Sequence, residues 1–105
     1  MEQITKPWGE EIVHIDEKEY VMKELRIKKG MHTSMHYHNQ KKETLYILKG
    51  VAKVEASVGS GFLNQGDTIT IPAGKVHRIT AYKEDLVIIE VSTQPKNDSV
   101  RVGNQ

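Results

Sequence analysis

Hydrophobic and polar residues alternate over short stretches along most of the chain, which is typical of β-strands with one buried face. The clearest case is residues 51–58, where Ala52 and Val54 fall on one face and Lys53 and Glu55 on the other. The same pattern predicts strands at 11–15, 20–27, 34–38, 44–49, 51–58, 68–71, 76–82 and 86–91. Many short strands with little helical periodicity predict an all-β sandwich or barrel.

Two local features refine this prediction. Gly59-Ser60-Gly61 is a candidate hairpin turn, because glycine adopts positive φ without steric cost. In the strand at 44–49, Leu45 and Ile47 on one face and Tyr46 and Leu48 on the other are all apolar. A strand that is apolar on both faces is usually covered on both. We therefore expect a second subunit over the outer face.

The length of 105 residues fits one domain, 1–105, with a core at about 10–93 and a polar tail at 94–105. The tail begins Gln94-Pro95, and we expect it to be extended or partly disordered. Charged residues make up 28% and hydrophobic residues 37%, which is a globular composition. The formal net charge is only +1 and the basic residues are scattered, which argues against nucleic acid or a membrane as a partner.

The chain has no cysteine, so neither a disulfide framework nor a thiolate nucleophile is available. The start, MEQITKPWGEEIV, lacks the basic and apolar stretches of a secretory signal. No apolar run approaches the roughly 20 residues that span a bilayer. These observations together predict a cytoplasmic protein.

The strongest chemical signal is a set of three histidines and one glutamate. His36 and His38 are two residues apart, so their imidazoles project from the same face of a strand. Glu43 follows a short polar loop, and His77 comes from a strand far along the chain. Three neutral imidazoles and a carboxylate suit one divalent transition metal: zinc, manganese, iron, cobalt or nickel. A His-x-His pair alone is a weak signal, and His14, between two apolar residues, is expected to be structural or solvent-facing.

The spacings of these residues match a known family pattern. Gly30-x5-His36-x-His38-x4-Glu43-x6-Gly50 resembles the first motif of the cupin superfamily at every defined position. The segment 66–77, Gly-x5-Pro-x-Gly-x2-His, resembles the second motif in the same way. The resemblance implies a cupin-type jelly-roll barrel, frequently a homodimer, with His36, His38, Glu43 and His77 as metal ligands inside it.

A narrower resemblance concerns both ends of the chain. Lys6-Pro7-Trp8-Gly9 and Asp98-Ser99-Val100-Arg101, with the Ile-Pro-Ala-Gly-x-x-His-Arg run between them, are similar to the cupin domain of type II mannose-6-phosphate isomerases and mannose-1-phosphate guanylyltransferases. This narrower resemblance implies that the small-molecule substrate is a sugar or a sugar phosphate.

Three functions are compatible with this site. The first is a metal-dependent aldose–ketose isomerase, in which a metal polarises the carbonyl and a base moves a proton between neighbouring carbons. The second is a non-catalytic module that binds metal and sugar, and the third is a small iron dioxygenase. His32 is the candidate base, because it shares even parity with His36 and His38; the alternative is a loop histidine at the barrel mouth. Lys42, Lys75 and Arg78 are candidate substrate contacts near the rim, or plain surface residues.

Overall fold

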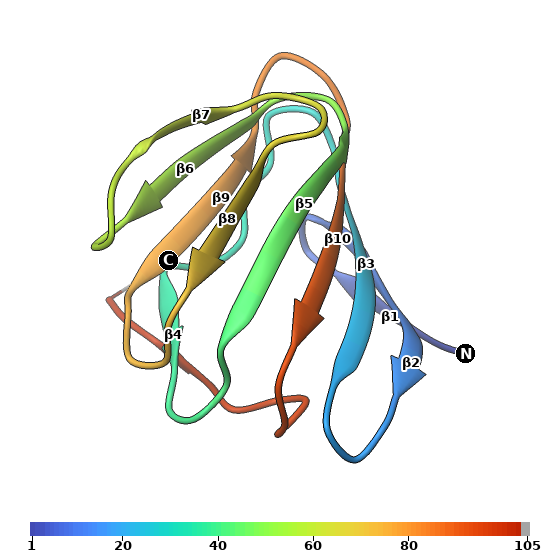
Figure 1. Cartoon of the computed structure of the whole chain (residues 1–105). Helices are drawn as coiled ribbons and strands as arrows, with labels where there is room; N and C mark the ends of the chain where they lie inside the picture. Colours follow the sequence, from blue (N-terminus) through green and yellow to red (C-terminus); the bar gives the residue numbers. More distant parts are fainter. Residues whose placement is uncertain (104–105) are drawn as a thin grey trace.

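The chain folds into two antiparallel β-sheets packed on each other, as seen in the computed structural model, which describes residues 1–103 (Figure 1). The first sheet has the strand order β1-β2-β3-β10-β5-β8, and the second has the order β11-β4-β9-β6-β7. The strands are β1 (Glu2–Lys6), β2 (Gly9–Asp16), β3 (Val21–Ile27), β4 (His36–His38), β5 (Glu43–Lys49), β6 (Ala52–Ala56), β7 (Gly61–Leu63), β8 (Thr68–Ile71), β9 (His77–Ala81), β10 (Leu86–Ser92) and β11 (Ser99–Arg101). This arrangement confirms the predicted all-β jelly roll.

The apolar core lies between the two sheets. Ile27, Ile47, Leu86 and Ile88 come from the first sheet, Ile79 comes from the second, and all five are buried. Burying one such side chain contributes roughly 1.5–3 kcal/mol relative to leaving it exposed. The core therefore holds the sheets together.

The inward faces of the central strands carry charged residues toward one end and aliphatic residues along the rest. On β3 the inward positions are Val21, Lys23, Leu25 and Ile27, and on β10 they are Ser92, Glu90, Ile88 and Leu86. The register pairs Glu90 with Lys23 and Leu86 with Ile27, so the charged positions of both strands lie at the same end of the sheet. The interior is thus divided into an apolar part and a polar part.

Three strands were not predicted from the pattern: β1, β7 and β11. β1 pairs with β2, and β11 pairs with β4, so the sheets extend beyond the predicted core of about 10–93 at both ends. The predicted tail, 94–105, thus contains a short strand, and its last two residues lie outside the described part of the chain. The hairpin predicted at Gly59-Ser60-Gly61 is present between β6 and β7, and Gly59 has a positive φ.

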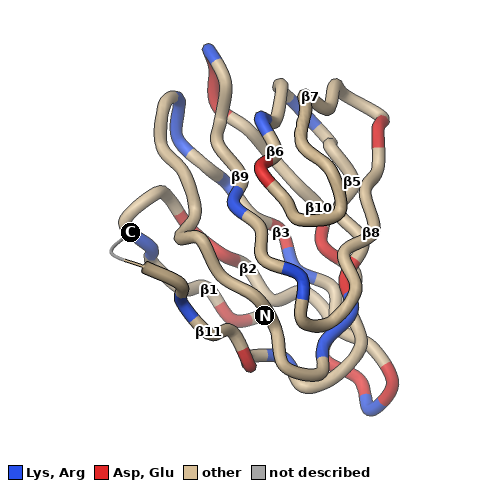
Figure 2. The backbone as a smooth tube through the Cα atoms, turned by 90° about the vertical axis from the view of Figure 1, so that its left-hand side faces the viewer, with Lys and Arg blue, Asp and Glu red and all other residues tan. Residues whose placement is uncertain are grey.

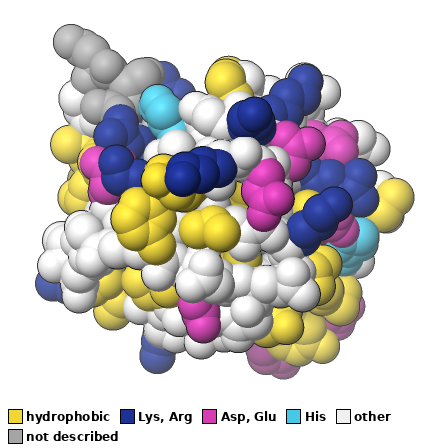
Figure 3. All heavy atoms as spheres, turned by 90° about the horizontal axis from the view of Figure 1, so that it is seen from above, with side chains coloured by type: hydrophobic (Ala, Val, Ile, Leu, Met, Phe, Trp, Pro, Cys, Tyr) yellow, Lys and Arg dark blue, Asp and Glu magenta, His cyan; other side chains and the backbone are white. Residues whose placement is uncertain are grey.

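Charged residues of both signs are spread over the fold, as the backbone trace in Figure 2 shows. At the end of the molecule seen in Figure 3, hydrophobic side chains lie beside Lys and Arg side chains. Phe62 and Tyr82 are exposed, and their ring centroids are 4.8 Å apart. Among residues 1–103, no helix is long and apolar enough to cross a membrane. The cytoplasmic location stays a prediction.

Candidate metal centre

Three imidazoles converge at the polar end of the interior. β4 supplies His36 and His38, and the neighbouring strand β9 supplies His77, which is in register with His36. One ring nitrogen of each histidine lies within 4.8 Å of those of the other two. The rings of His36 and His77 are closest, with centroids 4.4 Å apart. Backbone pairing of β4 with β9 therefore brings together histidines that are about forty residues apart in the sequence.

Glu43, the first residue of β5, adds a carboxylate from the opposite sheet. Its Oε1 lies 3.0 Å from Nε2 of His77, and its Oε2 lies 3.3 Å from Nε2 of His38. The side chain is only 3% exposed. All four residues of the predicted ligand set thus face the same small volume.

Each imidazole is anchored through Nδ1. His36 donates to the carbonyl oxygen of Ser34 at 2.7 Å, and His77 donates to that of Lys75 at 3.0 Å. His38 has a different partner, because its Nδ1 lies 3.1 Å from Oδ1 of Asp98. When the imidazole is neutral, this leaves Nε2 without a proton and able to bind a cation; when it is protonated, Nε2 donates instead, as those of His38 and His77 can to Glu43. Hydrogen bonds through Nδ1 orient metal-binding histidines and raise their basicity.

The protonation states fit a ligand set. Burial, helped by the proximity of His77, lowers the pKa of His36 to about 4, so this imidazole is neutral near pH 7. Burial opposes ionisation of Glu43, but hydrogen bonds from His38 and His77 outweigh it and hold the pKa of Glu43 below its usual range. Burial also opposes the charging of His77, but Glu43 outweighs it and raises the pKa of His77. A proton therefore competes more strongly with a cation at His77 than at His36.

A divalent cation fits these residues. Two ligand atoms bound to one ion at about 2.1 Å lie roughly 3.0–3.4 Å apart. Glu43 meets this spacing to His77 through Oε1 and to His38 through Oε2, while the three histidine nitrogens lie within 4.8 Å of one another. Glu43 Oε2 is fully buried and, when His38 is neutral, accepts no hydrogen bond from the described residues 1–103, with Lys41 Nζ 3.5 Å away. A cation would provide the missing partner. His36, His38, Glu43 and His77 could therefore hold the ion.

Beside this cluster lies a network of buried ion pairs. Lys41 Nζ is 2.7 Å from Glu90 Oε2 and 3.5 Å from Glu43 Oε2. Lys23 Nζ is 3.5 Å from Glu11 Oε1. Pairing is required here, because an uncompensated buried charge is costly. Glu90 is surrounded by protein, and burial together with the nearby Glu43 raises its pKa.

The charges of this region also favour a cation. The buried charged residues within 1–103 are three glutamates and two lysines: Glu11, Glu43, Glu90, Lys23 and Lys41. When all five are ionised, their sum is one negative charge, and the ionised Asp98 beside His38 adds a second. This negative sum favours the binding of a divalent cation.

Two adjoining cavities lead to the cluster. The inner cavity, of about 120 Å³, is lined by His36, His38 and the charged network. The outer cavity, of about 600 Å³, is lined by Met31, His32, Arg101 and others. Both are bordered by a shared set of residues: Lys6, Trp8, Ser34, His36 and Ser99. Trp8 also packs against the apolar core.

The other predicted site residues lie apart from the cluster. His32 is exposed and lines the outer cavity, and its Nδ1 donates to the carbonyl oxygen of Thr33 at 2.7 Å. Lys42 and Lys75 are exposed. Arg78 follows the inward-facing His77 and pairs with Glu55 at 3.0 Å. The structure thus brings His32 to the outer cavity and places Arg78 against a carboxylate.

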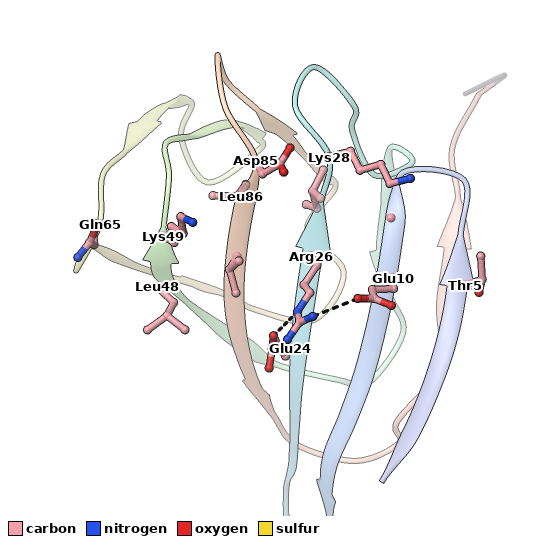
Figure 4. Close-up of a pocket in the computed structure, with 13 residues that line it drawn as sticks. Thr5, Glu10, Glu24, Arg26, Lys28, Leu48, Lys49, Gln65, Asp85 and Leu86 are labelled. Atoms are coloured by element: carbon pink, nitrogen blue, oxygen red, sulfur yellow. Dashed lines mark hydrogen bonds and ion pairs between the residues drawn. The ribbon is translucent and has the colours of Figure 1, made fainter.

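A larger hollow, of about 990 Å³, lies away from the histidines at one end of the first sheet (Figure 4). Arg26 occupies its middle and reaches Glu24 and Glu10. Leu48 and Lys49 lie on its rim. Because its central cation is already paired and no cluster of possible metal ligands borders it, we assign the chemistry to the histidine site.

The sequence of the chain was compared with known protein families and with solved structures. The family model described as "Mannose-6-phosphate isomerase C-terminal" matches residues 1–102. The chain belongs to this family. The chain is 26% identical over 106 aligned residues to a mannose-1-phosphate guanylyltransferase from Sinorhizobium fredii. That alignment covers 97% of this chain and 21% of the relative, so the chain spans about a fifth of the length of the relative.

Solved structures show the same fold. KdgF from Halomonas sp. superposes with a TM-score of 0.83 at 16% identity, covering 92% of this chain and 89% of that one. A protein from Silicibacter pomeroyi, described as a sugar phosphate isomerase from a cupin superfamily, superposes with a TM-score of 0.66 at 20% identity, covering 73% of this chain and 52% of that one. The chain described here therefore shares the fold of these proteins.

Several residues at the site were not predicted. Asp98 lies in the polar tail, and nothing in its local sequence indicates contact with His38. Lys23 and Glu90 did carry a signal, because each shares its parity with the apolar inward positions of its strand. Lys41 lies in a loop without periodicity, so its burial could not be predicted from the pattern.

Proposed function

We propose that this domain is a metal-dependent aldose–ketose isomerase acting on a sugar or sugar phosphate. The observation that carries the proposal is the convergence of His36, His38, Glu43 and His77 beside a polar cavity, in a chain of this family. These four residues would hold one zinc, manganese, iron, cobalt or nickel ion. When bound, the ion supplies Lewis acidity at the carbonyl and the adjacent hydroxyl of an open-chain sugar.

The residues of the chain would supply the remaining functions. The buried Lys41 lines the inner cavity and can donate a hydrogen bond to a sugar oxygen. His32 is the proposed base, because its Nδ1–H is held by Thr33 and its Nε2 is free to accept a proton. Glu90 is a second candidate, since it lines the inner cavity and has a raised pKa. Lys42, Lys75 and Arg78 stay proposals for substrate contacts.

The test combines metal analysis with an activity assay. Full-length protein purified without chelator should contain one equivalent of a divalent metal and should interconvert mannose 6-phosphate and fructose 6-phosphate. His36→Ala should lose both properties. His14→Gln should preserve both and serves as the control, because the exposed His14 pairs with Glu24 and lies outside the cluster. Absence of interconversion with every divalent metal tried would reject the isomerase.

A non-catalytic metal- and sugar-binding module is the second candidate. It is favoured by the state of the two base candidates: His32 is exposed and Glu90 is already paired with Lys41. Calorimetry that shows sugar binding, together with an assay that shows no conversion, would select this function.

We also propose a homodimer formed through the outer face of the first sheet. Tyr46 and Leu48 of β5 and Val91 of β10 are 41–48% exposed on that face. Arg26 lies between Glu24 and Glu10 on the same sheet, so the surface carries both signs of charge and can complement a second copy of itself.

A further inference from the structure

The outer cavity has the size of a ligand site, whereas the inner cavity does not. Small-molecule sites usually measure roughly 300–1,000 Å³, and the outer cavity of about 600 Å³ lies within that range. The inner cavity of about 120 Å³ has room for only about four water molecules at ~30 Å³ each. A hexose derivative that reaches the histidines must therefore leave most of its length in the outer cavity.

Two cations on the wall of the outer cavity have no partner. Lys6 and Arg101 both line it, and neither forms a side-chain ion pair or hydrogen bond with any residue of the described range. Two other lysines of the inner cavity differ, since Lys23 and Lys41 are both paired with glutamates. Lys6, at the boundary that the two cavities share, and Arg101 in the outer cavity therefore leave positive charge that no described residue neutralises.

Backbone pairing places Arg101 beside the histidine cluster. Arg101 is in register with His36, and Ser99 is in register with His38. Residues directly opposite each other in an antiparallel pair project from the same face, with Cβ atoms about 4.5–5.5 Å apart. Arg101 therefore extends from the inward face of β11 next to a candidate metal ligand, at the boundary where the outer cavity begins.

Lys6 reaches the same cavity from the other end of the chain. It is the last residue of β1, in register with Gly9, and is half-buried. The adjoining Trp8 packs against the core, and its carbonyl oxygen accepts a hydrogen bond from Lys28 at 2.9 Å. The position of Lys6 is thus fixed by a hairpin that is anchored on both sides.

We propose that Lys6 and Arg101 form an anion subsite, which holds a phosphate or carboxylate group at the end of the substrate remote from its carbonyl. The guanidinium group of Arg101 suits such a group, because it can donate two parallel hydrogen bonds to its oxygens. The carbonyl end then enters the inner cavity. The identity of the sugar rests on the proposed function, but the subsite itself does not require turnover.

Calorimetric titration tests this assignment. Zinc-loaded full-length protein is titrated with mannose 6-phosphate, with glucuronate and with mannose, which have a phosphate, a carboxylate and no anionic group. We expect the wild type to bind at least one anionic sugar more tightly than mannose. Arg101→Gln and Lys6→Gln should each reduce that preference about tenfold and leave mannose binding unchanged, and Arg101→Lys should retain part of it. The two anionic sugars distinguish a phosphate site from a carboxylate site.

Matched controls separate this subsite from other cations. Lys53→Gln removes an exposed lysine on the outward face of β6 and should keep the wild-type preference. Lys42→Gln and Lys75→Gln test whether the other proposed substrate contacts hold the anionic group instead. The proposal is overturned if wild type shows no preference, if Arg101→Gln and Lys6→Gln both retain it, or if Lys42→Gln or Lys75→Gln abolishes it. Anion preference without isomerisation would reject the isomerase and leave the subsite intact.

Discussion

The three histidines of the cluster are oriented by unequal partners. Two of them donate to backbone carbonyl groups, while His38 donates to the carboxylate of Asp98. The other oxygen of Asp98 accepts hydrogen bonds from the backbone amides of Gln40 at 2.7 Å and Lys41 at 3.1 Å. These amide bonds outweigh burial and lower the pKa of Asp98, so it is ionised at neutral pH. A single side chain therefore orients one imidazole and fixes the β4–β5 loop.

This arrangement predicts the effect of Asp98→Asn. The neutral amide offers one acceptor oxygen in place of two and removes the negative charge beside His38. We expect metal affinity to fall about tenfold, as is typical when a partner of a metal-binding histidine is exchanged. Competition with a chromogenic chelator measures the change. Asp67→Asn is the matched control, because Asp67 accepts a backbone hydrogen bond from Asn64 in a turn and should leave metal affinity unchanged. An unaltered affinity in Asp98→Asn would contradict this role.

At the scale of the strands, two positions of the first motif require glycine for different structural reasons. Both adopt positive φ, +78° at Gly30 and +92° at Gly50. A Cβ at Gly30 would meet nothing within 4 Å, whereas one at Gly50 would lie 2.5 Å from the carbonyl oxygen of Asp85. Gly50 is thus required by backbone conformation and by the close approach of the β9–β10 loop.

Alanine substitutions should separate these two requirements. Gly30→Ala should lower the free energy of unfolding by about 1–2 kcal/mol, the cost of a left-handed conformation. Gly50→Ala should lower it further, since the β9–β10 loop must also move. Denaturant unfolding measured by circular dichroism compares the two variants. Equal losses would show that the contact with Asp85 is relieved without cost.

The sequence predicted the strands that carry their own pattern, and missed those that depend on partners. The strands near β2, β3, β5, β6, β8, β9 and β10 follow from alternation, and the predicted ligands lie on strands that start at His36, Glu43 and His77. β11 is only three residues long and pairs with β4, so its existence depends on a strand about sixty residues earlier. For the same reason, the contact of Asp98 and the position of Arg101 could not be read from their neighbours.

At the scale of the whole molecule, the exposed outer sheet predicts a subunit interface. Leu48→Glu places a charge in the middle of the proposed contact and should convert a dimer into a monomer. Val58→Glu is the matched control, because Val58 is similarly exposed, at 44% against 46%, but lies beyond the end of β6. Light scattering on a sizing column gives the mass. A monomeric wild type, or a Leu48→Glu variant that stays dimeric, would contradict the interface.

The change from charged to aliphatic residues along β3 and β10 has a consequence for how this barrel tolerates alteration. The aliphatic part holds the two sheets together, and the charged part carries the candidate metal site. Exchanges among the charged side chains can therefore alter the chemistry without separating the sheets. Redesign of this protein can vary the charged part of the interior and keep the aliphatic part unchanged.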